Sequence, residues 1–494
     1  MVQKLNSSKS SKNGSEKNGT VPAPDSQFAE IDRVFELQKN NRWNIANTDA
    51  RTRIEKLNRL KDAIQARSHH LKDAMYKDFK KSPYEVEITE IYPVISEIND
   101  AIHNLRKWME PVPVPSPMTM FGSSSRLVYE PKGLCLIIGP WNYPFHLIMA
   151  PLAAAIAAGN CVIIRPSSNT RHTSEFTESL LKSIYSEDEI CVFNGTTDMA
   201  NHLLTKRFDH IFFTGSPSVG THIMEAAAKN LASVTLELGG KSPVIIDETA
   251  SLDYASSHVV WGKVLNGGQT CVGVDYVLVH ESREKEFLEK AKEKLKKFYG
   301  PNTEEWSTNP DFCRIINDKS FQRLKYLIDE TVKAGASVEM GGILDAAQKY
   351  ISPTILSKVP LSSAIMQEEI FGPIMPVITY RNLDEAIRII QSKDKPLALY
   401  MFSESDSNIH KVLKNTSSGG AVINGVIVHL ANANLPFGGV NHSGLGSYHG
   451  YFGFKTFSHE RAVLRVNKLN ILDKVFPPYG DFTTQLVNLM IKFF

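Results

Sequence analysis

Cys271 stands in a local sequence that would leave its sulfur open to a substrate. The preceding residues, 266–270, include two glycines and three polar side chains, whereas a cysteine in a packed core usually has apolar neighbours. A thiolate there can attack a carbonyl carbon and divide one difficult reaction into two easier steps. We therefore take Cys271 as the candidate nucleophile. The other cysteines are interpreted as buried, unreactive side chains: Cys135, Cys161, Cys191 and Cys313.

Glu237 is the candidate general base. It lies between Leu236 and Leu238 and precedes a pair of glycines. A carboxylate in apolar surroundings has a raised pKa and can accept a proton near neutral pH. An ion pair between Glu237 and Lys241 explains the same sequence equally well, so both interpretations stay open.

Asn142 is the candidate oxyanion donor. It lies in the turn from Pro140 to Pro144, which follows an apolar run, so it would stand at the carboxyl end of a strand. Ligands of open α/β sheets bind at that end. An amide there can stabilise the oxyanion that forms when a thiolate adds to an aldehyde. Taken alone, however, the segment is better explained as a rigid turn bounded by prolines.

Residues 213–220 have the composition of a phosphate-binding turn. They read Phe-Thr-Gly-Ser-Pro-Ser-Val-Gly and lie between an apparent strand and a helical run over residues 223–228. Gly215 and Gly220 would allow a tight turn that presents backbone amides at a helix N-terminus, where an anion is favoured. The spacing is not G-x-G-x-x-G, so by itself the segment also fits an ordinary strand–turn–helix corner.

Alternating strands and helices must position these residues. Apolar positions recur at helical spacing from Phe28 to Trp108, and residues 111–117, rich in proline, begin an extended segment. Short apolar runs then alternate with helical stretches, which is typical of α/β architecture. Buried parallel strands are expected at residues 134–138, 161–164 and 210–213, and a second α/β block from Leu238 onward includes residues 243–246, 276–279 and 375–378.

The composition is that of a soluble globular protein with at least two domains. The chain has 494 residues, of which 42% are hydrophobic and 22% charged, and single cores stop growing near ~250–300 residues. A net charge of +2 creates no strong field, so no nucleic-acid partner is expected. Five cysteines are too few for a disulfide framework and indicate a reducing compartment.

The two ends of the chain differ from its body. Residues 1–27 are rich in Ser, Lys, Asn and Gly and lack the apolar run of a secretory signal, which predicts a disordered tail on a protein that is not secreted. The sequence contains no run of ~18 apolar residues, so no membrane-spanning helix is predicted. Residues 482–494, with Asp481 as cap, predict an amphipathic helix about 20 Å long that lies in a membrane interface. Docking on the protein itself or on a partner subunit is the alternative.

Taken together, these segments resemble the aldehyde dehydrogenase superfamily. The resemblance rests on six segments in order: 140–144, 165–167 (Arg-Pro-Ser), 213–220, 236–241, 268–271 and 369–373 (Glu-Ile-Phe-Gly-Pro). Asp275-Tyr276 and the segments 436–439, 443–450 and 456–459 are similar to the class 3, long-chain fatty aldehyde branch. The likeness covers roughly residues 34–479.

The resemblance implies catalytic roles for three of these residues. Cys271 would be the nucleophile, and Asn142 with the Cys271 backbone amide would form the oxyanion hole. Glu237 would activate the water that hydrolyses the thioester, and no metal is implied. The reaction would be NAD(P)-dependent oxidation of aldehydes, medium- or long-chain fatty aldehydes above all, to carboxylic acids.

The resemblance also implies a set of cofactor-binding residues: Arg165, Ser168, Gly215, Ser216, Gly220, Glu369 and Phe371. Glu369 would bind the nicotinamide ribose with Phe371 beside it, and Ser216 would face the pyrophosphate. The family usually has Lys-Pro-Ser-Glu where this chain has Arg-Pro-Ser-Ser at 165–168. The missing glutamate would have repelled a 2′-phosphate, and Arg165 could pair with one, so NADP is expected alongside NAD.

The implied fold class is α/β, with a Rossmann-type cofactor domain, an α/β catalytic domain and a small bridging β-element, assembled as a homodimer. The expected division is as follows: 28–115 and 133–237 for the cofactor domain, 238–440 for the catalytic domain, 116–132 and 441–466 for the bridging and oligomerisation element, and 467–494 for a C-terminal tail. The expected location is the cytosolic face of the endoplasmic reticulum, a lipid droplet or the mitochondrial outer membrane, in lipid metabolism.

Other functions fit parts of the same pattern. Aromatic or isoprenoid aldehydes could be oxidised at the same site, and a thioester could be passed to coenzyme A rather than to water. A structural or scaffold protein on this fold is the non-enzyme alternative. Glu237 argues for water as the acceptor, and a scaffold would have no need for Cys271, Glu237, Asn142 and Glu369 together.

Overall fold

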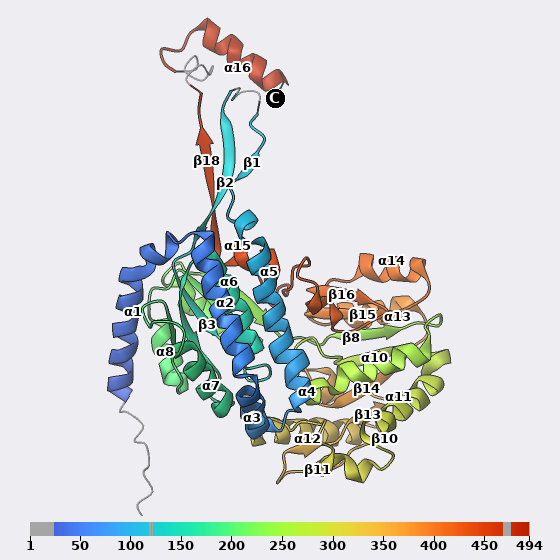
Figure 1. Ribbon diagram of the computed structural model, residues 1–494. Coiled ribbons are helices and arrows are strands. Elements are labelled where there is room, and N and C mark those ends of the chain that lie inside the picture. Colours follow the sequence, from blue (N-terminus) through green and yellow to red (C-terminus); the bar gives the residue numbers. More distant parts are fainter. Residues whose placement is uncertain (1–23, 118–119, 121, 468–475, 494) are drawn as a thin grey trace, which may run out of the picture.

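The structure, a computed structural model, describes residues 24–117, 120, 122–467 and 476–493 (Figure 1). Two large sheets with helices on both faces form the body, and a third, small sheet projects from it (Figure 1). Among these residues no helix combines the length and the apolar character needed to cross a membrane. The α/β fold class expected from the sequence is confirmed.

The N-terminal part is helical, as its periodicity predicts. Its elements are α1 Pro24–Ala46, α2 Ala50–Ala66, α3 Ser68–Phe79, α4 Pro83–Val86, the π-helix η1 Glu87–Ile91, and α5 Tyr92–Trp108. Asp49 caps α2 by accepting a hydrogen bond from the Thr52 amide at 2.8 Å. Helix α1 begins inside the tail predicted for residues 1–27, and residues 1–23 lie outside the described part.

The first large sheet has six strands in the order β17-β7-β6-β3-β4-β5. Its strands are β3 Leu134–Ile138, β4 Cys161–Arg165, β5 Ile190–Val192, β6 His210–Gly215, β7 Ser233–Leu238 and β17 Gly444–Leu445, and the helices between them are α6 His146–Ala158, α7 Arg171–Lys182, α8 Thr197–Leu204 and α9 Pro217–Ala228. The predicted buried parallel strands at 134–138, 161–164 and 210–213 are confirmed. Helices α1, α8 and α9 cover one face, and α2, α5, α6 and α7 cover the other.

The second large sheet has seven strands in the order β10-β13-β14-β9-β8-β15-β16. Its elements are β8 Pro243–Ile246, α10 Leu252–Val264, η3 Leu265–Gly268, β9 Tyr276–His280, η4 Glu281–Arg283, α11 Glu284–Tyr299, η5 Thr303–Thr308, α12 Asp318–Lys333, β10 Ser337–Met340, β13 Thr354–Ser357, η6 Ala364–Met366, β14 Ile374–Tyr380, α13 Leu383–Gln391, β15 Ala398–Phe402, α14 Asp406–Asn415, β16 Gly420–Ile423 and η7 Val428–Ala431. A short hairpin joins β11 Leu344–Asp345 to β12 Tyr350–Ile351. The strands expected at 243–246, 276–279 and 375–378 are confirmed as β8, β9 and β14.

The projecting sheet is antiparallel, in the order β1-β2-β18. Its strands are β1 Val112–Val114, β2 Ser124–Pro131 and β18 Ser458–Arg465, and α15 Gly450–Thr456 lies at its base. Helix α16, Asp481–Phe493, lies beyond its tip, away from the body (Figure 1). The predicted domain division stays a prediction. Two strand pairs, however, join segments that it assigns to different domains: β1 pairs with β2, and β17 pairs with β7.

Candidate active site

The turn between β3 and α6 brings Asn142 against the loop that carries Cys271. The Asn142 side chain is 3% exposed and donates from Nδ2 to the carbonyl of Gln269 at 3.0 Å. Its own carbonyl accepts a hydrogen bond from Asn266 Nδ2 at 2.9 Å. An amide nitrogen carries two protons, and the hydrogen bonds of the described residues use one of them at Asn142. The second proton has no acceptor among the described residues, so it remains for a ligand at the Cys271 loop.

The loop before Cys271 needs its glycines for steric reasons. Asn266, Gly267 and Gly268 have positive φ angles of 55°, 62° and 73°. A Cβ at Gly268 would come within 2.3 Å of the Gly372 carbonyl oxygen, so only glycine allows this approach. Gln269 is fully buried, and its side chain accepts from the Ile316 amide and donates to the Arg314 carbonyl at 3.0 and 3.1 Å. The loop thus holds the sulfur at a defined place.

Cys271 lines a cavity of about 480 Å³, within the range of small-molecule sites. Its walls come largely from residues 88–97 and 427–437, and they are mainly apolar or aromatic: Ile88, Tyr92, Trp261, Val272, Phe437 and Tyr448 are examples. Burial, together with the charges of Glu369 and Glu237, raises the pKa of the Cys271 thiol to about 12. The resting group is therefore a thiol that must lose its proton before it can attack.

Glu237 lies on β7 with its carboxyl buried and unpaired. The residue is 3% exposed, and neither oxygen has a hydrogen-bond partner among the described residues. This burial raises the pKa of the Glu237 carboxyl well above its ordinary value. Lys241 pairs instead with Asp275, at 2.5 Å, so the predicted ion-pair alternative for Glu237 is wrong. Glu237 therefore remains the candidate proton acceptor, and its charge raises the pKa of Cys271.

The turn after β6 offers backbone amides at a helix N-terminus. Ser216 precedes α9, is exposed, and has its hydroxyl 3.2 Å from that of Ser218. A Cβ at Gly220 would meet Leu238 Cδ2 at 2.8 Å, so glycine allows α9 to pack closely on β7. A Cβ at Gly215 would likewise come too close to the Phe213 ring, at 2.4 Å from its Cζ atom. The long α9 and its open first turn fit a pyrophosphate group.

Arg165 and Ser168 lie at the carboxyl end of β4. The Arg165 Nη2 atom donates to the carbonyls of Gly195 and Thr196 at 3.1 and 3.4 Å, and partial burial lowers its pKa. Ser168 is exposed. The guanidinium therefore faces the backbone of residues 195–196, and its pairing with a 2′-phosphate stays a prediction.

Glu369 and Phe371 lie on the loop before β14. A Cβ at Gly239 would come within 2.1 Å of Glu369 Oε2, so the carboxyl fills the space that this glycine leaves. Burial, with the nearby Asp275 charge, raises the pKa of Glu369 to about 8. The Phe371 ring packs edge-on against Trp141, with centroids 5.3 Å apart. The two residues thus lie between the glycine pair after β7 and the Asn142 turn, where a nicotinamide ribose would fit.

Some residues at the site were not predicted from the sequence. Tyr448 lines the cavity, and burial together with the charges of Glu237 and Cys271 raises its pKa. The Tyr143 hydroxyl lies 2.6 Å from Thr270 Oγ1 and thereby joins the Asn142 turn to the Cys271 loop. The exposed apolar residues Ile88 and Tyr92 at the cavity could have been noticed, because large apolar side chains that recur on a helix face usually become buried.

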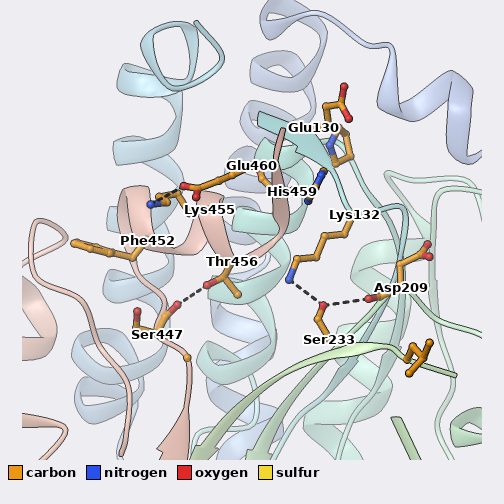
Figure 2. Close-up of a pocket in the computed structure, with 14 residues that line it drawn as sticks. Glu130, Lys132, Asp209, Ser233, Ser447, Phe452, Lys455, Thr456, His459 and Glu460 are labelled. Atoms are coloured by element: carbon orange, nitrogen blue, oxygen red, sulfur yellow. Dashed lines mark hydrogen bonds and ion pairs between the residues drawn. The ribbon is translucent and has the colours of Figure 1, made fainter. Parts of the chain in front are cut away.

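A second depression, of about 790 Å³, lies at the base of the projecting sheet (Figure 2). Lys132 donates to the Ser233 hydroxyl at 3.0 Å, and that hydroxyl donates to the Asp209 carbonyl at 3.1 Å. None of the predicted site residues lines it. Within the described ranges, no three His, Cys, Asp or Glu side chains gather as a metal site would require. This second depression therefore includes none of the residues to which the sequence assigns catalysis or cofactor binding.

Comparison with known proteins agrees with this geometry. Residues 6–463 match the model of the aldehyde dehydrogenase family. The chain is 43% identical to 4,4'-diaponeurosporen-aldehyde dehydrogenase of Staphylococcus aureus, over 88% of this chain and 94% of that one. It is 43% identical to aldehyde dehydrogenase family 3 member A2 of Pongo abelii, with 84% of each chain covered.

Two further similarities concern the cofactor and the fold. The dimeric NADP-preferring aldehyde dehydrogenase of Mus musculus is 43% identical, over 83% of this chain and 89% of that protein. The solved structure of Staphylococcus aureus AldH in its substrate-bound state superposes with a TM-score of 0.89 at 39% identity, covering 93% of this chain and 99% of that one.

Proposed function

Because the chain belongs to the aldehyde dehydrogenase family, and is an oxidoreductase that uses NAD or NADP, we propose that it oxidises medium- or long-chain fatty aldehydes to carboxylic acids. The observation that carries this proposal is the position of Cys271. Its sulfur lines a largely apolar cavity of about 480 Å³, with an unpaired, buried carboxyl on Glu237 close enough to influence its pKa.

The residues of this chain divide the chemistry between them. The Cys271 thiol releases its proton to solvent and the thiolate adds to the aldehyde carbon, while Asn142 Nδ2 and the Cys271 backbone amide donate hydrogen bonds to the resulting oxyanion. Bound NAD or NADP supplies a hydride acceptor. Glu237 then accepts a proton from the water that attacks the thioester, and its raised pKa suits it to hold that proton near neutral pH. The acid leaves, and the Cys271 sulfur is free again.

The apolar lining of the cavity supports an aliphatic substrate. Transfer of an alkyl chain from water into such a cavity is favourable by ~0.8 kcal/mol for each buried CH₂ group. An aldehyde with a longer chain therefore gains affinity until the cavity is filled. The second candidate substrate is an isoprenoid aldehyde, and the similarity to the diaponeurosporen-aldehyde enzyme favours it over an aromatic one.

We further propose that NADP is accepted as well as NAD. Ser168 provides no carboxylate to repel a 2′-phosphate, and Arg165 stands three residues earlier at the same strand end. The NADP preference in the name of the mouse relative supports this proposal.

The assembly that we propose is a homodimer on a membrane surface. The projecting sheet exposes most of β1 and β18 and leaves β2 largely half-buried, as an element that packs on a second copy would, and the mouse relative is named as dimeric. Phe482, Leu489 and Ile491 of α16 are each more than half exposed. Such a helix would lie in the cytosolic interface of an intracellular membrane, such as the endoplasmic reticulum, a lipid droplet or the mitochondrial outer membrane.

The proposed activity is tested by measuring NAD(P)H formation with a panel of aldehydes that runs from short aliphatic ones to hexadecanal, with isoprenoid and aromatic members. We expect the highest kcat/KM for a medium- or long-chain aldehyde and complete loss in Cys271→Ala. Turnover of short aldehydes alone would contradict the fatty aldehyde proposal. If turnover depends on added coenzyme A, then coenzyme A rather than water accepts the acyl group. Inactivity with every aldehyde would favour the scaffold alternative.

A further inference from the structure

The short loop that carries Glu369 is held by charged side chains from distant parts of the chain. Lys241, which follows β7, donates from Nζ to the carbonyls of Ile365 and Glu368 at 2.8 and 2.7 Å. Asp275, which precedes β9, pairs through Oδ1 with the same Nζ at 2.5 Å. Its other oxygen accepts a hydrogen bond from the Ile370 amide at 2.8 Å. Lys241 and Asp275 thus fix the loop on both sides of Glu369.

A third charged residue reaches the loop from another element. Arg323 on α12 donates from Nη1 to the Glu369 carbonyl at 3.0 Å and from Nη2 to the Ile370 carbonyl at 2.6 Å. The planar guanidinium matches two adjacent carbonyls, which a lysine ammonium could not hold with the same geometry. The backbone of Glu369 is therefore bound directly, and that of Ile370 through both its amide and its carbonyl.

A gain in folding stability alone does not explain why Lys241 and Asp275 form a buried ion pair. The Lys241 and Asp275 side chains are 9% and 4% exposed, and a buried ion pair seldom stabilises a fold more than apolar residues of the same size would. It also places the Asp275 charge near Glu369, where it adds to the burial that raises the pKa of the Glu369 carboxyl. A buried charge that lies where it repels a neighbouring carboxylate is better explained by what it positions.

We propose that Asp275, with Lys241 and Arg323, is a positioning residue that holds Glu369 in place to bind the nicotinamide ribose. The inference rests on the proposed function, since the role of Glu369 follows from the family resemblance. It gives a role to Asp275 of the Asp275-Tyr276 pair, which the resemblance associates with the class 3 branch. Asp275 would act through the backbone of the loop and without contact to the cofactor.

The first test examines the loop without any cofactor. Hydrogen exchange of the residues 365–370 is measured by mass spectrometry in the full-length protein and in Asp275→Asn and Arg323→Ala. We expect exchange of this segment to become about tenfold faster, which corresponds to the loss of one hydrogen bond to a charged group. Arg323 is partly exposed, so its variant should fold even if Asp275→Asn does not.

A matched control is available in Arg283→Ala. Arg283 likewise donates to two backbone carbonyls, those of Glu248 and Ala250 at 2.8 and 3.4 Å, and has a similar exposure, 27% against 32% for Arg323. It holds a different loop, so its variant should exchange like the wild type at residues 365–370.

The second test is the affinity for NADH, measured by fluorescence titration. We expect Kd to rise about tenfold in Asp275→Asn and Arg323→Ala, to rise less in Arg323→Lys, and to stay unchanged in Arg283→Ala. Unchanged loop exchange, or faster exchange with unchanged Kd, overturns the proposal. A wild-type protein that binds no NADH would instead contradict the proposed function, and the exchange data would still decide whether the loop is held as described.

Discussion

The side chain of Asn142 donates a hydrogen bond to the backbone carbonyl of Gln269 at 3.0 Å, although 127 residues separate them along the chain. The bond fixes the amide of Asn142 against the loop that carries the nucleophile Cys271, with one proton still unused. The return bond from Asn266 to the Asn142 carbonyl closes this contact from the other side. The oxyanion donor is therefore placed before a substrate arrives, which is the condition under which such a donor accelerates a reaction.

The first prediction concerns this donor. Asn142→Ala should lower kcat by about 10²- to 10³-fold, because one of two donors to the oxyanion is lost, while KM changes little. Steady-state kinetics with a saturating cofactor provide the measurement. Asn160→Ala serves as control: Asn160 is equally buried but bonds to the Ala155 and Phe457 carbonyls, so its loss should lower Tm and leave kcat near that of the wild type.

The second prediction concerns the thiol of Cys271. Because burial raises its pKa to about 12, the thiolate fraction of the cofactor-free protein should increase about tenfold for each pH unit from 7 to 10. The rate constant of alkylation by iodoacetamide should increase in the same proportion. Cys271→Ala, which retains the four buried cysteines, gives the background rate. A plateau of the rate below pH 9 would contradict the raised pKa.

The third prediction concerns stability. The folded-state pKa of Glu237 lies well above its unfolded value, so between these two values the folded protein binds more protons and loses stability as the pH rises. The loss has a slope of at most about 1.4 kcal/mol per pH unit. Glu237→Gln removes this penalty. Its Tm should equal that of the wild type at pH values below the unfolded-state pKa and should exceed it by a growing margin as the pH rises above that pKa; a variant Tm below that of the wild type at neutral pH would show that the carboxylate has a stabilising partner.

The fourth prediction concerns the choice of cofactor. Ser168→Glu restores a carboxylate at the end of β4 and should reduce kcat/KM for NADP by at least about tenfold, through repulsion of the 2′-phosphate, with little change for NAD. Ser168→Gln, of nearly equal size but without charge, is the control. If the wild type strongly prefers NAD and Ser168→Glu does not alter the ratio, the NADP proposal fails.

The fifth prediction concerns α16. A chain truncated after Tyr479 lacks the helix and should remain in the supernatant after cell fractionation, whereas the full chain should sediment with membranes. Ile491→Asp places a charge on the most exposed of the apolar α16 side chains that the structure describes, at 77% exposure, and should have the same effect. If the truncated and full chains sediment equally, α16 does not bind the membrane and the proposal for this helix is wrong.

The sequence predicts those elements whose signal is local. Strands β3, β4 and β6 are buried on both faces, so they read as continuous runs of apolar and β-branched residues. The chemical character of Cys271 is equally visible, because the glycines that give the loop its left-handed angles are adjacent in the chain. The roles of these residues came from the family resemblance rather than from any single motif.

What the sequence could not show depends on pairing between distant strands. Lys241 pairs with Asp275 because β8 lies beside β9, with Pro243 opposite Tyr276. Nothing near Glu237 in the chain reveals this neighbour, so the ion-pair alternative for Glu237 could not be rejected. Arg323 was missed for the same reason, since it contacts the Glu369 loop through backbone carbonyls, which carry no sequence signal.

The central claim is that the substrate becomes bound to one sulfur atom, and trapping the acyl-enzyme tests it most directly. Glu237→Gln is mixed with hexadecanal and NAD, stopped by acid, digested, and analysed by peptide mass spectrometry. Because the variant retains the nucleophile but lacks the base for hydrolysis, a hexadecanoyl group should accumulate on the peptide that contains Cys271, with about one equivalent of NADH formed. An acyl group on another residue, or hexadecanoic acid and NADH released by Cys271→Ala at the wild-type rate, would contradict the account.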